Sequence, residues 1–403
     1  MSGPLDGVRV LDLTSNFMGP YAALLLADAG ADVCKIEAPG GDTTRGVGPR
    51  RHPGMSAIFL HLNRNKRSLV LDLKHDDART ALHRMVGSAD VLMYTLRPAA
   101  MLRLSLSYEQ VSSLNPRLIY CGAFGFGQNG PYADRPAYDD LIQAAVGMPV
   151  LQSRKSGQPN YVASAVADRV VGMAMCNAIS MALYCREKTG RGQEVQVPMF
   201  ETFAHFVMGD HLYGKTFDPP IGETGYSRMM NADRRPYQTR DGYLGVNVYT
   251  DRHWRKFFIA VGHPEMIKDP RFADIHARTE NIAKLYQFLA DILVTRSTAE
   301  WMEILTEADI PAIQMNTPDS LLDDPHMKDV GFFIDENHPS EGRLRSLGIA
   351  QSWSENQPEI RLPAPRLGEH TQEVLTEYGF HTSEIDSLIA DGAAYAEVET
   401  TVN

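Results

Sequence analysis

Apolar positions in the first part of the chain follow two alternating periodicities. Short runs at Val8–Leu13 and Asp32–Glu37 have the composition of buried strands. Between them, Pro20–Asp28 carries three consecutive leucines in a helix-length stretch that Gly30 ends. We expect Pro20 to open this helix, because its missing N–H would have no partner at the first position. The pattern predicts a βαβ unit.

Strand and helix patterns keep alternating to about residue 200. Alternation of this kind is typical of a mainly parallel sheet covered by helices on both faces. The sequence therefore predicts an α/β fold. The expected strands are Ser68–Leu73, Asp90–Tyr94, Leu118–Phe124 and Glu194–Met199, and the expected helices are Asp76–Gly87, Ser107–Leu114, Leu141–Gly147 and Asp168–Lys188.

A second, smaller α/β unit is expected beyond residue 225. It follows Lys215–Gly225, a stretch rich in Pro and Gly with the composition of a linker. The tail beyond Leu321 is interrupted by Pro and Gly until a last predicted helix. The elements expected in these parts are a strand at Tyr243–Val248 and helices at Arg252–Val261, Asn281–Val294 and Thr371–Tyr378.

Charge and hydropathy narrow the class of protein. The net charge is −11 over 403 residues, without a run of Lys and Arg, so a nucleic-acid partner is not expected. The N-terminal sequence lacks the basic flank and apolar stretch of a secretory signal. The most apolar helix, Val170–Tyr184, contains Asn177 and Ser180 and is shorter than the ~20 residues of a membrane span. We expect a cytoplasmic protein without a membrane partner, in which this helix is buried.

Several kinds of site are not expected. Cys34, Cys121, Cys176 and Cys185 are widely spaced, which indicates reduced cysteines. The first βα turn contains only Gly19, where a dinucleotide site needs three glycines. The sequence also lacks the phosphate-binding, zinc and serine-hydrolase motifs, and its histidines are scattered. We therefore expect no metal and no bound prosthetic group.

Asp168 begins the longest apolar helix pattern, and its position allows two interpretations. Aspartate is a favoured N-cap residue, and the position taken alone favours this structural role. A carboxylate at a helix N-terminus also lies among unpaired N–H groups, which we expect to hold it ionised. If it is shielded from water, it can act as a covalent nucleophile. Spacing leaves both interpretations open.

Six segments follow one another in a characteristic order. They are PLDGVRVLDLT, MGPYAALLLADAGADVCKIE, NRNKRSLVLDLK, GFGQNGPYADRPAYDDLIQAAVGM, DRVVGMAMCNAISMALYCREKTGRGQEV and APRLGEHTQEVL. Together they resemble the class III CoA-transferase family, the CaiB/BaiF group that contains formyl-CoA transferase and carnitine CoA-transferase. The resemblance covers nearly the whole chain.

The resemblance implies an activity and a nucleophile. The family aspartate upstream of TGRGQ corresponds to Asp168. Coenzyme A would pass from an acyl-CoA, with succinyl-CoA as one common donor, to a free carboxylic acid. The implied intermediates are an aspartyl anhydride and an aspartyl-CoA thioester. CoA is then a substrate, with small carboxylic acids as the other partners.

The resemblance also implies binding residues, which the residue types alone would assign to ordinary surface positions. An acyl pocket is implied at Tyr138 and Asp139. Arg228, Arg234 and Arg235 are candidates to bind the second carboxylate of a diacid. The implied CoA contacts are Ser15, Asn16, Phe17, Met18, Leu71, Lys74, Arg97 and Arg103.

The chain departs from formyl-CoA transferase at several positions. That enzyme carries Gln in place of Phe17, Arg in place of Ala38 and Glu in place of Asp139. Its run of four glycines has no equivalent in the corresponding stretch, Gly225–Gly242. Formate–oxalate exchange is therefore not expected.

Two alternative functions stay open. The α-methylacyl-CoA racemases resemble this chain but carry a His–Asp pair where Tyr138 and Asp139 stand. Tyrosine, with an ordinary pKa of about 10, is a poor base near neutrality. A catalytically inactive CoA-binding protein is the second alternative, and the presence of Asp168 at its motif position argues against it.

The family architecture gives an expected domain plan. A large Rossmann-like CoA-binding domain would comprise residues 1–210 and 322–403, and a small α/β domain would comprise 226–315. Residues 211–225 and 316–321 would link them. The resemblance also implies a homodimer of two interlocked chains.

Overall fold

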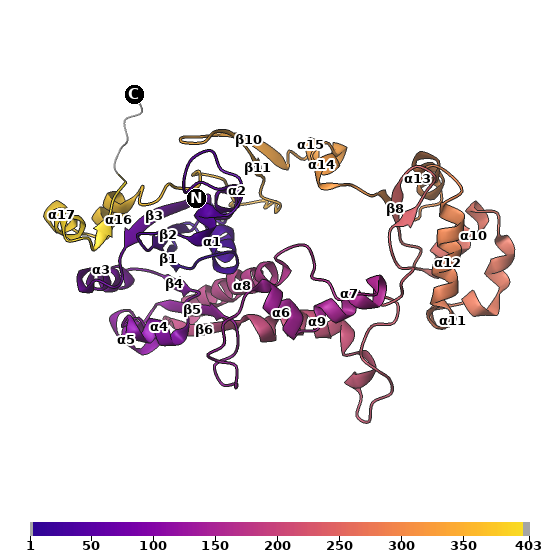
Figure 1. The fold of residues 1–403 in the computed structure, drawn as a ribbon, viewed down its shortest axis with the longest axis horizontal. Coiled ribbons are helices and arrows are strands. Elements are labelled where there is room, and N and C mark those ends of the chain that lie inside the picture. The colour runs from indigo at the N-terminus through magenta and orange to yellow at the C-terminus, as the bar shows by residue number, and fades with distance from the viewer. Residues whose placement is uncertain (1–2, 398–403) are drawn as a thin grey trace. The chain divides into compact units, whose positions relative to one another are not determined.

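The computed structural model describes residues 3–397 and contains two compact units, drawn in Figure 1. The domain limits expected from the resemblance stay a prediction, and their ends at residues 1–2 and 398–403 lie outside the described residues. The large unit comprises Met1–Val146, Val162–Phe206 and Asp329–Asn403, and the small unit comprises Gly147–Tyr161 and Val207–Lys328.

A seven-stranded sheet forms the centre of the large unit, with the order β12-β3-β2-β1-β4-β5-β6. Its strands pair in parallel, except that the short β12 pairs antiparallel with β3. Strands β1 to β5 are almost wholly buried, which explains their continuous apolar runs. The predicted α/β fold with a mainly parallel sheet is confirmed. The strands are β1 Arg9–Leu13, β2 Asp32–Glu37, β3 Lys66–Leu71, β4 Val91–Tyr94, β5 Ile119–Phe124, β6 Gln193–Pro198 and β12 Ala394–Tyr395.

Helices cover both faces of this sheet. On one face, α3, α5, α16 and α17 contribute to a single apolar cluster with alternate residues of the strands. On the other face, α1 and α8 pack against each other and against β2, β5 and β6. The helices of the large unit include α1 Met18–Asp28, η1 Thr43–Gly46, α2 Ala57–Asn63, α3 Asp76–Val86, α4 Pro98–Arg103, α5 Tyr108–Leu114, α6 Asp139–Ala145, α8 Val166–Thr189, α16 Thr371–Glu377 and α17 Thr382–Ala390.

The strand order reverses direction at β1. From β1 the chain builds toward β2 and β3 on one side, and later toward β4, β5 and β6 on the other. In open sheets of this order, ligands bind outside the carboxyl ends of the strands at the reversal. There the backbone N–H of Ser15, after β1, donates to Oγ1 of Thr95, after β4, at 3.1 Å. The carboxyl ends of β1 and β4 are therefore a candidate binding region.

Some predicted elements differ from the observed ones. Helix α1 begins at Met18, so Pro20 is its third residue and does not open it. Proline is tolerated there because the first four N–H groups of a helix have no intrahelical partner. The helix predicted to be last, α16, is followed by α17 and by β12. The two residues of β12 are too few to show a periodicity in the sequence.

The small unit contains a three-stranded antiparallel sheet with the order β7-β8-β9. Its core joins Trp254, Phe257 and Phe258 of α10 to the leucines of α12 and to Trp301 of α13. It contains α7 Met148–Ser156, η2 Tyr213–Thr216, β7 Tyr237–Gln238, β8 Tyr243–Val246, α10 Asp251–Ala260, η3 Pro264–Lys268, η4 Pro270–Phe272, α11 Ile275–Glu280, α12 Ile282–Leu293, α13 Thr298–Glu307, β9 Ala312–Gln314 and α14 Pro318–Leu321.

Four further elements complete the described chain. Helix α9 spans one limit between the two units, and helix α15 spans another. Strands β10 and β11 form an antiparallel hairpin of the large unit, in register from the pair Phe333–Leu347 to the pair His338–Gly342. The bounds are α9 Met199–His211, α15 Pro325–Asp329, β10 Phe333–His338 and β11 Gly342–Leu347.

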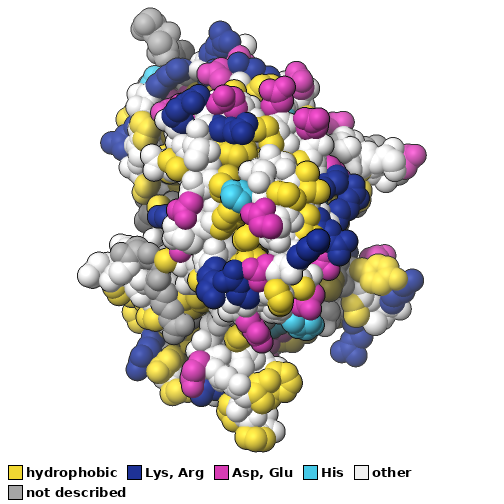
Figure 2. Space-filling model, turned by 90° about the vertical axis from the view of Figure 1, so that its right-hand side faces the viewer, with side chains coloured by type: hydrophobic (Ala, Val, Ile, Leu, Met, Phe, Trp, Pro, Cys, Tyr) yellow, Lys and Arg dark blue, Asp and Glu magenta, His cyan; other side chains and the backbone are white. Residues whose placement is uncertain are grey.

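Helix α8 is the one described helix that is long and apolar enough to cross a membrane. One face of α8 packs along α1, α6 and two strands. Met173, Met181 and Tyr184 on this helix are exposed, so the expectation of a buried helix is wrong for its other face. On the face drawn in Figure 2, Lys and Arg side chains are interspersed with Asp and Glu side chains, and apolar side chains lie between them. Such mixing produces no extended field of one sign there.

Candidate active site

Asp168 lies in the first turn of α8, as its third helical residue. The N-cap position belongs to Ala165, whose side chain makes no capping hydrogen bond. The N-cap interpretation of Asp168 is therefore wrong, because the helix begins two residues earlier than the apolar pattern indicates. The carboxyl group of Asp168 is half-buried and does not cap the helix.

A carboxylate from another helix accepts a hydrogen bond from this first turn of α8. Oδ1 of Asp139, the first residue of α6, accepts a hydrogen bond of 3.0 Å from the backbone N–H of Asp168. Its Oδ2 accepts one of 2.6 Å from Nε2 of Gln143. Gln143 is fully buried, and its Oε1 accepts from the backbone N–H of Val162 at 2.9 Å. Gln143 therefore ties together α6 and the segment that enters α8.

The electrostatics of Asp168 differ from the expectation for a helix N-terminus. Burial, reinforced by the nearby charge of Asp139, raises the pKa of Asp168 to about 7, and Arg169 opposes this rise. The expectation that the helix field holds the carboxylate ionised is wrong, because removal from water outweighs it. A carboxyl group with a pKa near neutrality is ionised in part at pH 7, and such shifts cluster at functional sites.

Close packing places the Asp168 end of α8 beside the loop that follows β1. Gly172 lies one helical turn after Asp168, and a Cβ there would be 2.7 Å from the carbonyl oxygen of Met18. The same Cβ would meet the ring of Tyr21 at 3.1 Å. Only glycine allows the two helices to approach so closely. The structure thus brings Asp168 and the loop at Ser15–Met18 into one region.

That loop is held by a network of buried charges beneath it. Asn16 is left-handed, with φ of 67°, and its backbone N–H donates to Oδ1 of Asp42 at 3.2 Å. Asp42 pairs through Oδ2 with Nζ of Lys35 at 2.8 Å, and both side chains are fully buried. Lys35 also donates to the carbonyl oxygen of Thr14 at 3.0 Å. Buried charges with these partners fix the loop backbone.

The four other expected CoA contacts follow the carboxyl ends of β3 and β4. Lys74, Arg97 and Arg103 are exposed, and among the described residues their side chains have no hydrogen-bond or ion-pair partner. They are therefore available to phosphate groups. The Leu71 side chain is only 1% exposed and packs in the core. Its contact with CoA stays a prediction, as do those of Ser15, Asn16, Phe17 and Met18.

Tyr138 and Asp139, both expected in the acyl pocket, differ in their exposure to solvent. Tyr138 occupies the N-cap position of α6, and its side chain is 66% exposed. Asp139 is half-buried and faces the first turn of α8. Of the two, the structure places Asp139 against Asp168.

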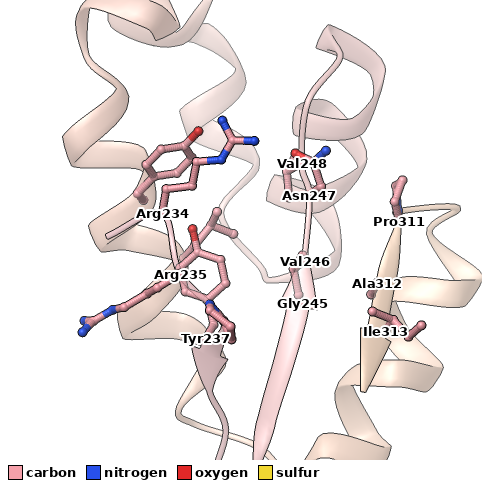
Figure 3. Close-up of a pocket in the computed structure, with 13 residues that line it drawn as sticks. Arg234, Arg235, Tyr237, Gly245, Val246, Asn247, Val248, Pro311, Ala312 and Ile313 are labelled. Atoms are coloured by element: carbon pink, nitrogen blue, oxygen red, sulfur yellow. The ribbon is translucent and has the colours of Figure 1, made fainter. Parts of the chain in front are cut away.

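The arginines expected to bind a diacid belong to the small unit. Arg234 and Arg235 line a cavity of about 550 Å³ there. In Figure 3 their side chains run in different directions, and the guanidinium of Arg235 points away from Asn247 and Ile313. Arg235 is mostly exposed and pairs with Asp233 at 3.5 Å.

Arg228 has different surroundings. It is 5% exposed, and its guanidinium lies over the ring of Tyr249, 5.0 Å from the centroid. Its Nε has no hydrogen-bond partner among the described residues. The three arginines therefore do not form one cluster of equivalent groups.

Three contributors were missed from the sequence. Gln143 stands four residues after Asp139, a spacing at which helical side chains meet, so that pair was open to prediction. Thr95 and Asp42 act through contacts across the sheet edge, which only the strand order reveals. Among the described residues, no group of three or more His, Cys, Asp or Glu side chains could hold a metal ion.

Comparison with known proteins identifies the family. The model of CoA-transferase family III matches residues 5–371. A probable fatty acyl-CoA transferase of Mycobacterium tuberculosis is 30% identical over 91% of this chain and 96% of that protein. An acetyl-CoA:oxalate CoA-transferase of Acetobacter aceti is 36% identical over 77% of this chain and 80% of that protein.

A solved structure supports the same assignment. The crystal structure of a CaiB/BaiF family protein from Brucella suis superposes with a TM-score of 0.79 at 30% identity, covering 94% of this chain and 100% of that chain. The α/β fold and the family match agree. The chain therefore belongs to CoA-transferase family III and is an enzyme of the CoA-transferase class.

Proposed function

We propose that the enzyme moves coenzyme A from an acyl-CoA to a free carboxylic acid, with Asp168 as the covalent nucleophile. One observation carries the proposal: a half-buried carboxyl group with a pKa of about 7 packs beside the loop at the strand-order reversal. A carboxylate of this kind loses little solvation when substrate covers it, which makes it a stronger nucleophile than one in water.

The first half of the proposed reaction loads CoA onto the enzyme. A carboxylate oxygen of Asp168 attacks the thioester carbonyl carbon, and the C–S bond breaks to give an acyl-aspartyl anhydride and CoA thiolate. The thiolate then attacks the aspartyl carbonyl of the anhydride. The original acid leaves as its carboxylate, and Asp168 becomes an aspartyl-CoA thioester.

The second half reverses these steps with a new acid. The acceptor carboxylate attacks the aspartyl thioester and displaces the thiolate, which forms a second anhydride. The thiolate attacks the acyl carbonyl of that anhydride, giving the new acyl-CoA and restoring the Asp168 carboxylate. Each intermediate stays activated, so hydrolysis must be prevented by excluding water.

Two features of the site support this sequence. The charge of Asp139 destabilises the ionised carboxylate of Asp168, and conversion of Asp168 to the uncharged anhydride or thioester removes that repulsion. The Gly-rich stretch between β5 and α6 can supply backbone N–H donors to the anionic transition states.

The substrates are proposed at the level of class. The acceptor is a small carboxylic acid, and succinyl-CoA is one proposed donor. The name of the Acetobacter relative includes oxalate, a diacid, whereas that of the Mycobacterium relative includes a fatty acyl group. Arg228 is the arginine proposed to bind a second carboxylate, because it is buried, whereas Arg235 is exposed and already paired.

A substrate panel tests the function. Purified enzyme is incubated with pairs of acyl-CoA and free acid, and new acyl-CoA is detected by mass spectrometry. Transfer supports the proposal, whereas loss of an α-proton from a 2-methylacyl-CoA in D₂O without transfer would establish the racemase alternative. If neither occurs and CoA still binds, the chain is a binding protein. For the diacid, unchanged KM values in Arg228→Ala and Arg235→Ala across mono- and diacids would remove both arginines from that role.

We also propose a cytoplasmic homodimer, an assembly that rests on the family resemblance. Light scattering coupled to gel filtration measures the mass directly. A mass near twice 44.7 kDa supports the dimer, and a mass near 44.7 kDa contradicts it.

A further inference from the structure

A cavity of about 650 Å³ lies in the large unit, between α1 and α8 on the side where the chain passes after β11. Its volume falls within the ~300–1,000 Å³ typical of small-molecule sites. Neither Asp168 nor Ser15–Met18 lines it, although Arg169, the residue after Asp168, does. An inference about this cavity therefore does not rest on the proposed function.

The walls of the cavity are mainly apolar. Leu24 and Leu25 of α1 face it from one side, and Ile349, Ala350 and Trp353 face it from the other. Trp353 is 49% exposed although it is large and apolar. A hydrocarbon ligand along these walls would remove apolar surface from water, which is the main driving force for binding such groups.

A basic group is set into this apolar lining. Arg169 of α8 is half-buried, and its guanidinium lies over the ring of Tyr21, 4.4 Å from the centroid. Among the described residues its side chain has no hydrogen-bond or ion-pair partner. The charge of Asp168, the preceding residue, acts on this guanidinium, but that carboxyl group is ionised only in part near neutral pH. The partly desolvated cation can therefore still pair with an anionic ligand.

The other basic side chains of the lining divide into two kinds. Arg64 is satisfied by a bidentate pair with Asp28, at 3.1 and 2.7 Å. His61 of α2 has no hydrogen-bond partner for its ring among the described residues, and burial lowers its pKa. A neutral imidazole can still donate one hydrogen bond. Arg169 therefore supplies the free charge, and His61 is a second potential donor.

We propose that this cavity binds a free carboxylic acid with a straight hydrocarbon chain, its carboxylate paired with Arg169 and its chain lying along Leu24, Leu25 and Trp353. Asp168 itself does not line the cavity, so the proposed ligand is an acid other than the one that reacts. The chemistry specifies a long-chain monocarboxylate, because the lining offers one unpaired guanidinium and extended apolar walls.

Tryptophan fluorescence gives a direct test, because Trp353 lines the cavity while Trp254 and Trp301 lie in the core of the small unit. The wild-type enzyme is titrated with hexanoate, octanoate and decanoate and with the matched 1-alkanols. Each added CH₂ is expected to tighten binding about 4-fold. Acids are expected to bind at least about 10-fold more tightly than the alcohols. Trp353→Phe should remove the signal.

Variants locate the ligand. Arg169→Met should abolish the preference for acids over alcohols, while Arg191→Met, at an exposed position outside the cavity, should leave it unchanged. Ser180→Phe, which fills the cavity, should weaken acids and alcohols alike. Asp168→Asn should retain binding, since that side chain does not line the cavity.

The outcomes decide between two accounts. Binding that depends on chain length, on Arg169 and on Ser180 but not on Asp168 supports the proposal. Absence of saturable binding, equal affinity for hexanoate and decanoate, or an unchanged acid preference in correctly folded Arg169→Met overturns it. The wild-type chain-length series stays decisive if a variant fails to fold.

Discussion

The backbone N–H of Asp168 donates a hydrogen bond of 3.0 Å to the carboxylate of Asp139, so two acidic side chains meet at the first turn of α8. This contact satisfies one helix N–H that would otherwise lack a partner. It also keeps a negative charge beside the proposed nucleophile. The pair therefore links the local structure of α8 to the reactivity of Asp168.

The pH dependence of the reaction should report this pair. Because Asp168 attacks as a carboxylate and its pKa is about 7, kcat/KM for the acyl-CoA is expected to rise with pH through that value and then level off. In Asp139→Asn the like charge is lost, so the inflection should move to lower pH. The measurement is the pH profile of initial rates for wild type and variant.

Asp140→Asn is the matched control for that profile. Asp140 is the exposed neighbour of Asp139 in the same helical turn, so its loss should leave the inflection in place. An inflection that stays near 7 in Asp139→Asn would contradict the electrostatic role assigned to Asp139.

The stability of the protein should depend on the same carboxyl group. A pKa raised from 3.8 to about 7 means that the folded state binds the Asp168 proton more tightly than the unfolded state. Its stabilising contribution is full below pH ~4 and is lost as pH rises through ~7. Asp168→Asn should therefore be more stable than wild type at pH 8, by about 2 kcal/mol after allowance for partial exposure.

Urea unfolding at pH 4 and at pH 8 measures this difference. The advantage of the Asn variant should be much smaller at pH 4 than at pH 8. An advantage that is the same at both values would show that burial does not raise the pKa of Asp168.

The close approach of α1 and α8 predicts the effect of a single methyl group. Gly172→Ala places a Cβ about 2.7 Å from the carbonyl oxygen of Met18, so the helices must separate. We expect a loss of about 1–3 kcal/mol in the free energy of unfolding. The separation should also raise the KM for acyl-CoA, because the loop at Ser15–Met18 packs through this contact.

Gly209→Ala is the matched control in another helix. A Cβ at Gly209 would have no atom within 4 Å, so the change should be neutral or stabilising by up to about 1 kcal/mol. Denaturant unfolding of the two variants compares them directly. If Gly172→Ala is as stable as Gly209→Ala, the proposed tight contact is absent in solution.

The parts of the fold that the sequence predicted are those with a local signal. The sequences of β1 and β2 predict strands because both are short runs with the composition of buried strands, and the fold buries them on both faces. The leucines of α1 predict the helix between them. The order of strands could not be read, because pairing depends on contacts between distant segments. Strand β12 was missed because two residues show no period.

The site was predictable only in part, for a similar reason. Asp168 was identified through the family motifs, whereas its raised pKa depends on burial in the fold and on Asp139, which lies 29 residues earlier. The N-cap interpretation failed because the helix begins at Val166, two residues before Asp168. Residues that act through tertiary contacts leave little trace in the spacing of the sequence.

The central claim is the covalent role of Asp168, and trapping of the acyl-enzyme tests it most directly. Wild-type enzyme is incubated with acyl-CoA and then with hydroxylamine, and peptide mass spectrometry locates the modified residue. We predict a hydroxamate at Asp168 in wild type, and in Asp168→Ala both the absence of this adduct and a loss of transfer of at least about 10³-fold. A hydroxamate at another residue, or transfer that persists in Asp168→Ala, would contradict the account.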